Sequence, residues 1–298
     1  HSNAQIIAKN AHFFATMSSD ELENKHTAVR NIRKWPNNPR ILTIIIFLVI
    51  TILWCVLPIR AFLCDVGIAI SPWLFPFVSA DLYVQVAIIL CSVFLFSDAP
   101  FIDESAPYVI VRSGRLLWTA GQIFHIFIAS AILVVFIVML TMLPFVNRIE
   151  WTVEWGKAIG TISLTNAASV YNIPFVLYQR IIYSFSPVSA MGLSMLLNWM
   201  MCSLIGLIMF VFNMSIGHSS GSIICCTITM FNYFIANFLS ARWLRFSPIS
   251  LSNIAYFDNV NITPGYSIYI LSAMIGIFTC AAFVAIHKKN LSVAHTLA

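Results

Sequence analysis

The chain has 298 residues, of which 60% are hydrophobic and 9% are charged, and its formal net charge is +5. Soluble domains average about 45–50% apolar and about 25% charged residues, so this composition excludes an ordinary soluble protein. It predicts an all-α integral membrane protein, because lipid offers no hydrogen-bonding partner to an unpaired backbone group. The seven cysteines form no CxxC pair, and we expect neither a disulfide framework nor a metal site.

The chain before the first apolar run divides into two parts. Ser-Asn-Ala at 2–4 is typical of the short sequence that remains after an expression tag is removed, so we interpret residues 1–16 as a tag or upstream extension. Met17 begins a stretch that fits a native start. We predict that residues 17–40 form a basic, amphipathic arm that lies as an interfacial helix on the membrane surface.

Apolar runs of membrane-crossing length follow, given that a helix needs about 20 apolar residues to span a bilayer. A polar break at 215–222 divides the long stretch 181–241, which has no Lys, Arg, Asp or Glu. In the second run, Asp81 falls in the first turn, after Ser79 as a candidate N-cap. The six predicted spans cover about 41–61, 79–97, 119–143, 189–213, 222–239 and 266–286.

The positive charges of the flanking segments predict the orientation. Ten Lys and Arg residues lie on the side of the two termini and six lie on the opposite side. Because cytoplasmic loops carry the excess of Lys and Arg, we place both termini in the cytosol, the tail at 290–298 included. The 97–118 loop and the 215–221 turn lie on the same side, whereas segments 144–188 and 240–265 face outside.

The loop SDAPFIDESAPYVIVRSGRLLW, residues 97–118, combines three acids and two arginines with several apolar side chains. One interpretation is a tight turn that holds its charges at the lipid headgroups. The other is a docking element for a cytosolic partner, in which apolar anchors give affinity and charges set the register. The charged and apolar residues that would make such contacts are Asp98, Phe101, Ile102, Asp103, Glu104, Tyr108, Arg112 and Arg115.

A family resemblance favours the docking element. The basic arm, the loop FSDAPFIDESAPYVIVRSGRLLW between spans two and three, the short turn between spans four and five, and RFSPIS between spans five and six form one layout. Over residues 25–289 this layout resembles the permease subunits of ABC exporters of the second, six-helix export type found in Gram-positive bacteria.

The resemblance implies a set of partners and roles. Residues 101–107 would form a short coupling helix that fits a groove on a separate ABC ATPase, and the arm at about 20–38 would also touch it. Two permease chains, identical or different, would pair around a translocation pathway in the cell membrane. The chain itself would be no enzyme and hold no cofactor, because ATP and Mg²⁺ would bind to the partner. No nucleic acid would be involved.

Two motif-like strings carry no catalytic prediction. Around WGKAIG, Trp151 stands where a P-loop needs its first glycine, and Ala158 stands where it needs Ser or Thr. We therefore expect nucleotide chemistry on another polypeptide. GHSSG at 217–221 fits the serine-hydrolase pattern but joins two membrane helices, with no acid across 181–241, so we interpret it as a polar turn.

Polar residues inside the spans are the remaining candidates for function. Such residues face other helices or a cavity, and we select Gln122, His125 and Asn198 as candidate pathway-lining residues. No carboxylate lies in the middle of a span, which argues against a proton-coupled secondary transporter. The alternatives are a secondary transporter, or a ligand-binding membrane sensor or immunity protein, without an ATPase partner.

Overall fold

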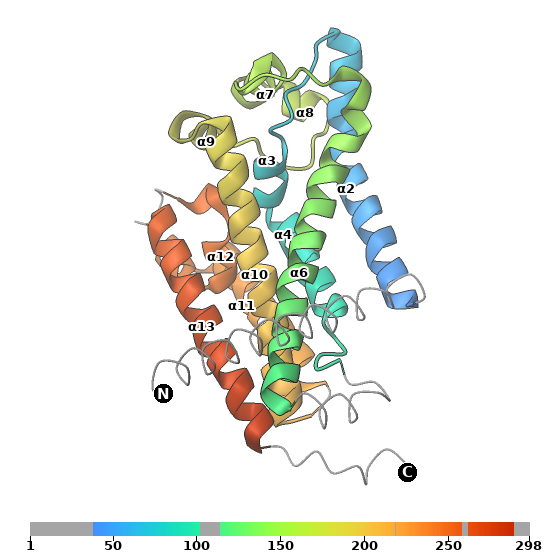
Figure 1. Cartoon of the computed structure of the whole chain (residues 1–298). Coiled ribbons are helices and arrows are strands. Elements are labelled where there is room, and N and C mark those ends of the chain that lie inside the picture. The colour runs from blue at the N-terminus through green and yellow to red at the C-terminus, as the bar shows by residue number, and fades with distance from the viewer. Residues whose placement is uncertain (1–37, 102–113, 218, 258–261, 289–298) are drawn as a thin grey trace, which may run out of the picture.

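The computed structural model describes residues 38–101, 114–217, 219–257 and 262–288 (Figure 1). These residues form α-helices and short 3-10 helices without a β-strand, apart from one isolated parallel bridge between Ile70 and Ile149. The predicted all-α class is thus confirmed for the described part. The predicted upstream extension, most of the arm and the C-terminal tail lie outside the described residues.

Five of the described helices are long and apolar enough to cross a membrane, which supports a membrane-spanning protein. The first begins after Asn38, whose side chain accepts a hydrogen bond from the Arg40 N–H (3.0 Å), and ends at Gly67 with φ 72°. The bounds are α2 (Pro39–Val66), α6 (Arg115–Met142) continued by η2 (Leu143–Arg148), α10 (Pro187–Ser215), α11 (Ser220–Phe238) and α13 (Pro264–Lys288). Each overlaps one predicted span almost completely.

The predicted second span, 79–97, corresponds mainly to α4 (Leu82–Leu95), and its first two residues belong to a separate short helix, α3 (Phe75–Ala80). Asp81 is extended between them and caps α4, since its side chain accepts hydrogen bonds from Tyr83 N (2.9 Å) and Val84 N (3.1 Å). The predicted cap, Ser79, instead lies inside α3. The 14 residues of α4 extend about 21 Å, less than the apolar thickness of a bilayer, so a sixth crossing stays a prediction.

Helix α10 is the central element of the bundle and packs against α13, α6, α11 and α4 (Figure 1). It is far more buried than the other long helices. Gly206 on α10 allows this packing, because a Cβ there would lie 2.5 Å from Ile126 Cγ2 and 3.0 Å from the Phe96 ring.

The connecting segments gather at two ends. At one end lie η2, α7 (Gly156–Leu164), α8 (Ala167–Val170) and α9 (Gln179–Ser184), near the C-terminus of α2 (Figure 1). Arg148 Nη1 joins this region to α2 by donating to the Leu63 carbonyl (2.9 Å). The beginning of α2, residues 97–101 and the turn between α10 and α11 meet at the other end. Residues 97–101 and the turn between α10 and α11 thus lie at the same end of the bundle, and their side of the membrane stays a prediction.

The segment after α11 was predicted to lie on the outer side of the membrane, which stays a prediction, and part of it folds back against the bundle. It forms η3 (Ala241–Phe246), α12 (Pro248–Leu251) and η4 (Ile254–Tyr256), and the chain from Ile249 to Ile254 is buried. This part contacts α3, α10 and α13. The reason is a set of internal hydrogen bonds that satisfy its polar side chains, as described below.

Candidate functional site

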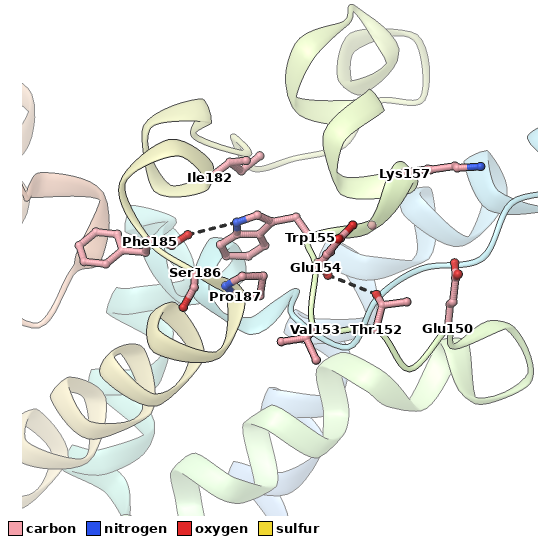
Figure 2. Close-up of a pocket in the computed structure, with 11 residues that line it drawn as sticks. Glu150, Thr152, Val153, Glu154, Trp155, Lys157, Ile182, Phe185, Ser186 and Pro187 are labelled. Atoms are coloured by element: carbon pink, nitrogen blue, oxygen red, sulfur yellow. Dashed lines mark hydrogen bonds between the residues drawn. The ribbon is translucent and has the colours of Figure 1, made fainter.

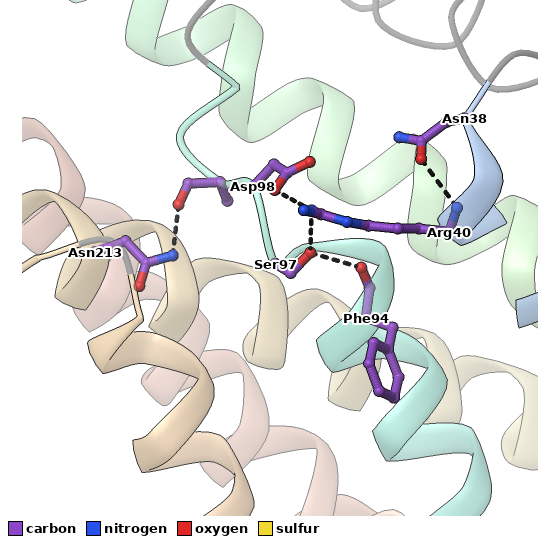
Figure 3. Close-up of polar contacts among 7 residues, drawn as sticks. Asn38, Arg40, Phe94, Ser97, Asp98 and Asn213 are labelled. Carbon is purple, nitrogen blue, oxygen red and sulfur yellow. Dashed lines mark hydrogen bonds and ion pairs between the residues drawn. The ribbon is translucent and has the colours of Figure 1, made fainter. Parts of the chain in front are cut away.

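The junction where α4 leaves the bundle is held by α2. We define the junction as residues 97–101 with Arg40, His125 and Asn213. Arg40 Nη1 donates to Ser97 Oγ (3.0 Å) and forms an ion pair with Asp98, while Ser97 Oγ donates to the Phe94 carbonyl (3.0 Å), as Figure 3 shows. The first turn of α2 is thereby fixed to the chain that follows α4.

Asn213, near the end of α10, fixes the same segment from the other side. Its amide nitrogen donates to the Ala99 carbonyl (2.6 Å) (Figure 3). Its amide oxygen accepts from the backbone N–H of Gly221 in the first turn of α11 (2.8 Å). The side chain is 2% exposed. Because each bond replaces water at a buried backbone group, Asn213 links residue 99 to two long helices at once.

Phe101 links the junction to α6. Its ring meets the imidazole of His125 edge to face, with ring centroids 4.8 Å apart and an angle of 87° between the planes. His125 is buried and Phe101 is partly exposed. Aromatic pairs in this geometry are worth about 0.5–1.5 kcal/mol beyond their buried area. Phe101, which precedes the rest of the loop, is thus packed against α6.

Residues 97–101 therefore contact side chains of α2, α6 and α10, and Asn213 connects them to α11. Dense packing of buried side chains resists continuous deformation, so contacts of this kind can carry a displacement from residues 97–101 to these helices. This arrangement suits the transmission of a movement better than a chemical step. No group of three or more His, Cys, Asp or Glu residues within the described ranges could hold a metal ion.

The predicted coupling residues are placed only in part. Asp98 and Phe101 lie in the junction, and Arg115 begins α6, where its carbonyl accepts the Thr119 hydroxyl (2.8 Å). Outside the described residues lie Ile102, Asp103, Glu104, Tyr108 and Arg112. Sequence reasoning did not assign Arg40 and Asn213 to the site, because each pairs with a residue far away along the chain.

The three candidate pathway residues are buried within the chain. Gln122 is 0%, His125 is 2% and Asn198 is 4% exposed. The Asn198 amide donates to the Ser194 carbonyl of its own helix (2.8 Å), and Gln122 and His125 lie on one face of α6. Their role in a pathway stays a prediction.

A second polar cluster lies at the break between α3 and α4. The Gln85 amide nitrogen donates to the Ile249 carbonyl (2.8 Å) and to Ser252 Oγ (3.0 Å), and the Asn253 amide donates to the Ala80 carbonyl (2.8 Å). The Asn253 bond satisfies the Ala80 carbonyl in the last turn of α3, and the Gln85 bonds hold the α12 region beside α4.

Asn232 on α11 anchors the same region. Its amide oxygen accepts the hydroxyls of Ser247 and Ser250, both at 2.7 Å. Nearby, burial raises the pKa of Tyr256 to about 12, with smaller contributions from the charges of Tyr178 and Asp81. The Tyr256 phenol is therefore neutral at physiological pH.

Comparisons with models of protein families, with curated proteins and with solved structures found no match to this chain. The junction and the pattern of spans are therefore the features from which a function can be proposed.

Proposed function

We propose that the chain is the transmembrane permease subunit of an ATP-driven ABC exporter in a bacterial cell membrane. In this proposal it pairs with a second permease chain, identical or different, and a separate soluble ATPase binds ATP and Mg²⁺. The chain itself catalyses no reaction. The cargo crosses along a pathway formed by the two permease chains.

The junction is the observation that carries the proposal. A coupling element must leave the membrane at one end of the bundle and be fixed to several helices, so that a movement at its tip reaches the spans. Residues 97–101 lie at one end of the bundle and contact Arg40, Asn213 and His125 of three helices, which supports this role. A mere surface turn would need neither the buried amide of Asn213 nor the ring contact of Phe101.

The proposed mechanism is alternating access. ATP closes the ATPase dimer, the coupling elements follow that movement, and hydrolysis resets the spans. ATP can drive such a cycle only if it binds the two states with different affinity. The alternative of proton coupling receives little support, because the acids of the chain lie outside the middle of the predicted spans.

Substitution of Phe101 tests the contact between the junction and the partner. We expect Phe101→Asp to lower the amount of co-purifying ATP-binding subunit about tenfold or more, as for a central apolar anchor at an interface. Phe101→Tyr keeps the ring on His125 and should retain the complex. Size-exclusion chromatography of the affinity-purified protein gives both stoichiometries. An intact complex with Phe101→Asp would remove the coupling role.

Labelling of single cysteines tests the proposed orientation. Cys64, Cys226 and Cys280 are exposed and are first replaced by serine. Gly160→Cys and Gly217→Cys lie at opposite ends of the bundle, and a Cβ meets nothing within 4 Å at either position.

We expect a membrane-impermeant maleimide to label Gly160→Cys in intact cells and Gly217→Cys only after permeabilisation. The two variants control for each other, because each carries one added thiol in the same background. The reverse pattern would invert the proposed topology and place the junction outside the cell.

A further inference from the structure

A pocket of about 620 Å³ lies at the end of the bundle opposite the junction. Residues 150–157 form one wall, and α9 with the first residues of α10 form the other (Figure 2). The volume falls within the range of about 300–1,000 Å³ that is typical of small-molecule sites.

The walls of the pocket are fixed by Trp155. Its indole N–H donates to the Phe185 carbonyl (3.2 Å), which joins the two walls, and its ring meets Phe77 edge to face at 5.2 Å. The Trp155 carbonyl accepts the Ser71 hydroxyl (2.6 Å). Gly156 follows with φ 74°, and a Cβ there would lie 3.2 Å from Ser71 Cβ. A site built before binding loses less entropy when a ligand enters.

The lining combines aromatic surface with negative charge. Trp155 supplies ring surface, Ile182 and Pro187 supply aliphatic surface, and Glu150 and Glu154 supply two carboxylates, whereas the Phe185 ring points away towards Phe257 (Figure 2). Lys157 is the one cation among the lining residues, and its side chain extends away from the Trp155 indole (Figure 2). Aromatic faces attract cations through the ring quadrupole, most strongly for tryptophan, and the carboxylates add to that attraction.

We propose that this pocket binds an organic cation that carries apolar groups, such as a substituted ammonium. The apolar part lies on the Trp155 ring and on Ile182 and Pro187, and the positive charge lies towards Glu150 and Glu154. The lining residues point to a cation because their net charge is negative, and to an apolar body because an indole ring and two aliphatic side chains face the pocket. This site goes beyond the proposed permease function and does not require an ATPase.

Calorimetric titration of the purified chain in nanodiscs tests the site with benzyltrimethylammonium as the probe. We expect saturable binding that the double variant Glu150→Gln, Glu154→Gln weakens about fivefold to tenfold. Asp65→Asn is the matched control, because it removes an exposed carboxylate outside the pocket lining. It should leave the affinity unchanged. Benzyl alcohol, which carries the ring without the charge, should bind about tenfold or more weakly than the cation.

Charge reversal at Lys157 provides a second measurement that does not depend on the folding of the double variant. Lys157→Glu adds negative charge to the lining and should strengthen binding of the cation about threefold. Equal affinities for the double variant and Asp65→Asn would overturn the proposal. So would equal binding of benzyl alcohol, unchanged affinity in Lys157→Glu, or no saturable binding of the cation up to about 10 mM.

Discussion

Replacement of Asn213 by leucine is expected to lower the free energy of unfolding by about 2–6 kcal/mol. The side chain is buried and bonds two backbone groups, the Ala99 carbonyl and the Gly221 N–H. Leucine satisfies neither, and each buried group that loses its partner costs about 1–3 kcal/mol. Unfolding by SDS in mixed micelles, followed by circular dichroism, measures the change.

Asn237→Leu is the matched control for this prediction. Asn237 is exposed on α11, and its amide donates to the Tyr233 carbonyl of the same helix (2.8 Å). Its loss should change stability by about 0.5 kcal/mol or less, as at other surface positions. If both leucine variants unfold alike, Asn213 does not hold the junction.

Gly221→Ala is expected to be the second strongly destabilising substitution. A Cβ at Gly221 would lie 2.7 Å from the Met209 Cα and 2.8 Å from the Asn213 amide oxygen. Backbone cannot move aside as a flexible side chain can, so α10 and α11 must separate and the Asn213 bond must lengthen. Overpacking of this kind costs about 1–3 kcal/mol, and the lost hydrogen bond adds to it.

Gly276→Ala is the control, because a Cβ at Gly276 meets nothing within 4 Å on α13. Alanine favours a helix over glycine by about 0.8–1.0 kcal/mol, so this variant should be neutral or slightly more stable. The two substitutions are chemically identical, and we expect opposite signs in the same SDS titration. A stability loss of the same size in both would contradict close packing at Gly221.

The long helices could be predicted from the sequence because each follows from the length of one apolar run. The first residues of the second apolar helix could not, because Asp81 rather than Ser79 caps α4 and the preceding chain forms the separate helix α3. The Gln85 amide bonds the Ile249 carbonyl, and the Asn253 amide bonds the Ala80 carbonyl. Both contacts form only after the α12 segment has packed beside α3 and α4. For the same reason the burial of the α12 segment could not be predicted, because Ser247 and Ser250 bond Asn232 of α11 and Asn253 bonds the Ala80 carbonyl only in the folded bundle.

The residue types of the candidate site could be predicted from the sequence, but the contacts between those residues could not. The mixed charge of the loop after the second apolar run is a local feature of the sequence, and together with the family resemblance it selected Asp98 and Phe101. Their surroundings are not local, since Arg40 lies 58 residues from Asp98 and Asn213 lies 114 residues from Ala99. Such pairings depend on the tertiary fold, and no local pattern in one chain encodes them.

Affinity purification of the chain from its native membrane tests the proposed permease function most directly. We expect a soluble subunit with a Walker motif to co-purify in stoichiometric amount, and we expect Phe101→Asp to release it while Phe101→Tyr retains it. If no ATP-binding protein accompanies the chain under mild solubilisation, the permease has no source of energy. The junction would then be a structural turn in a membrane protein of another function.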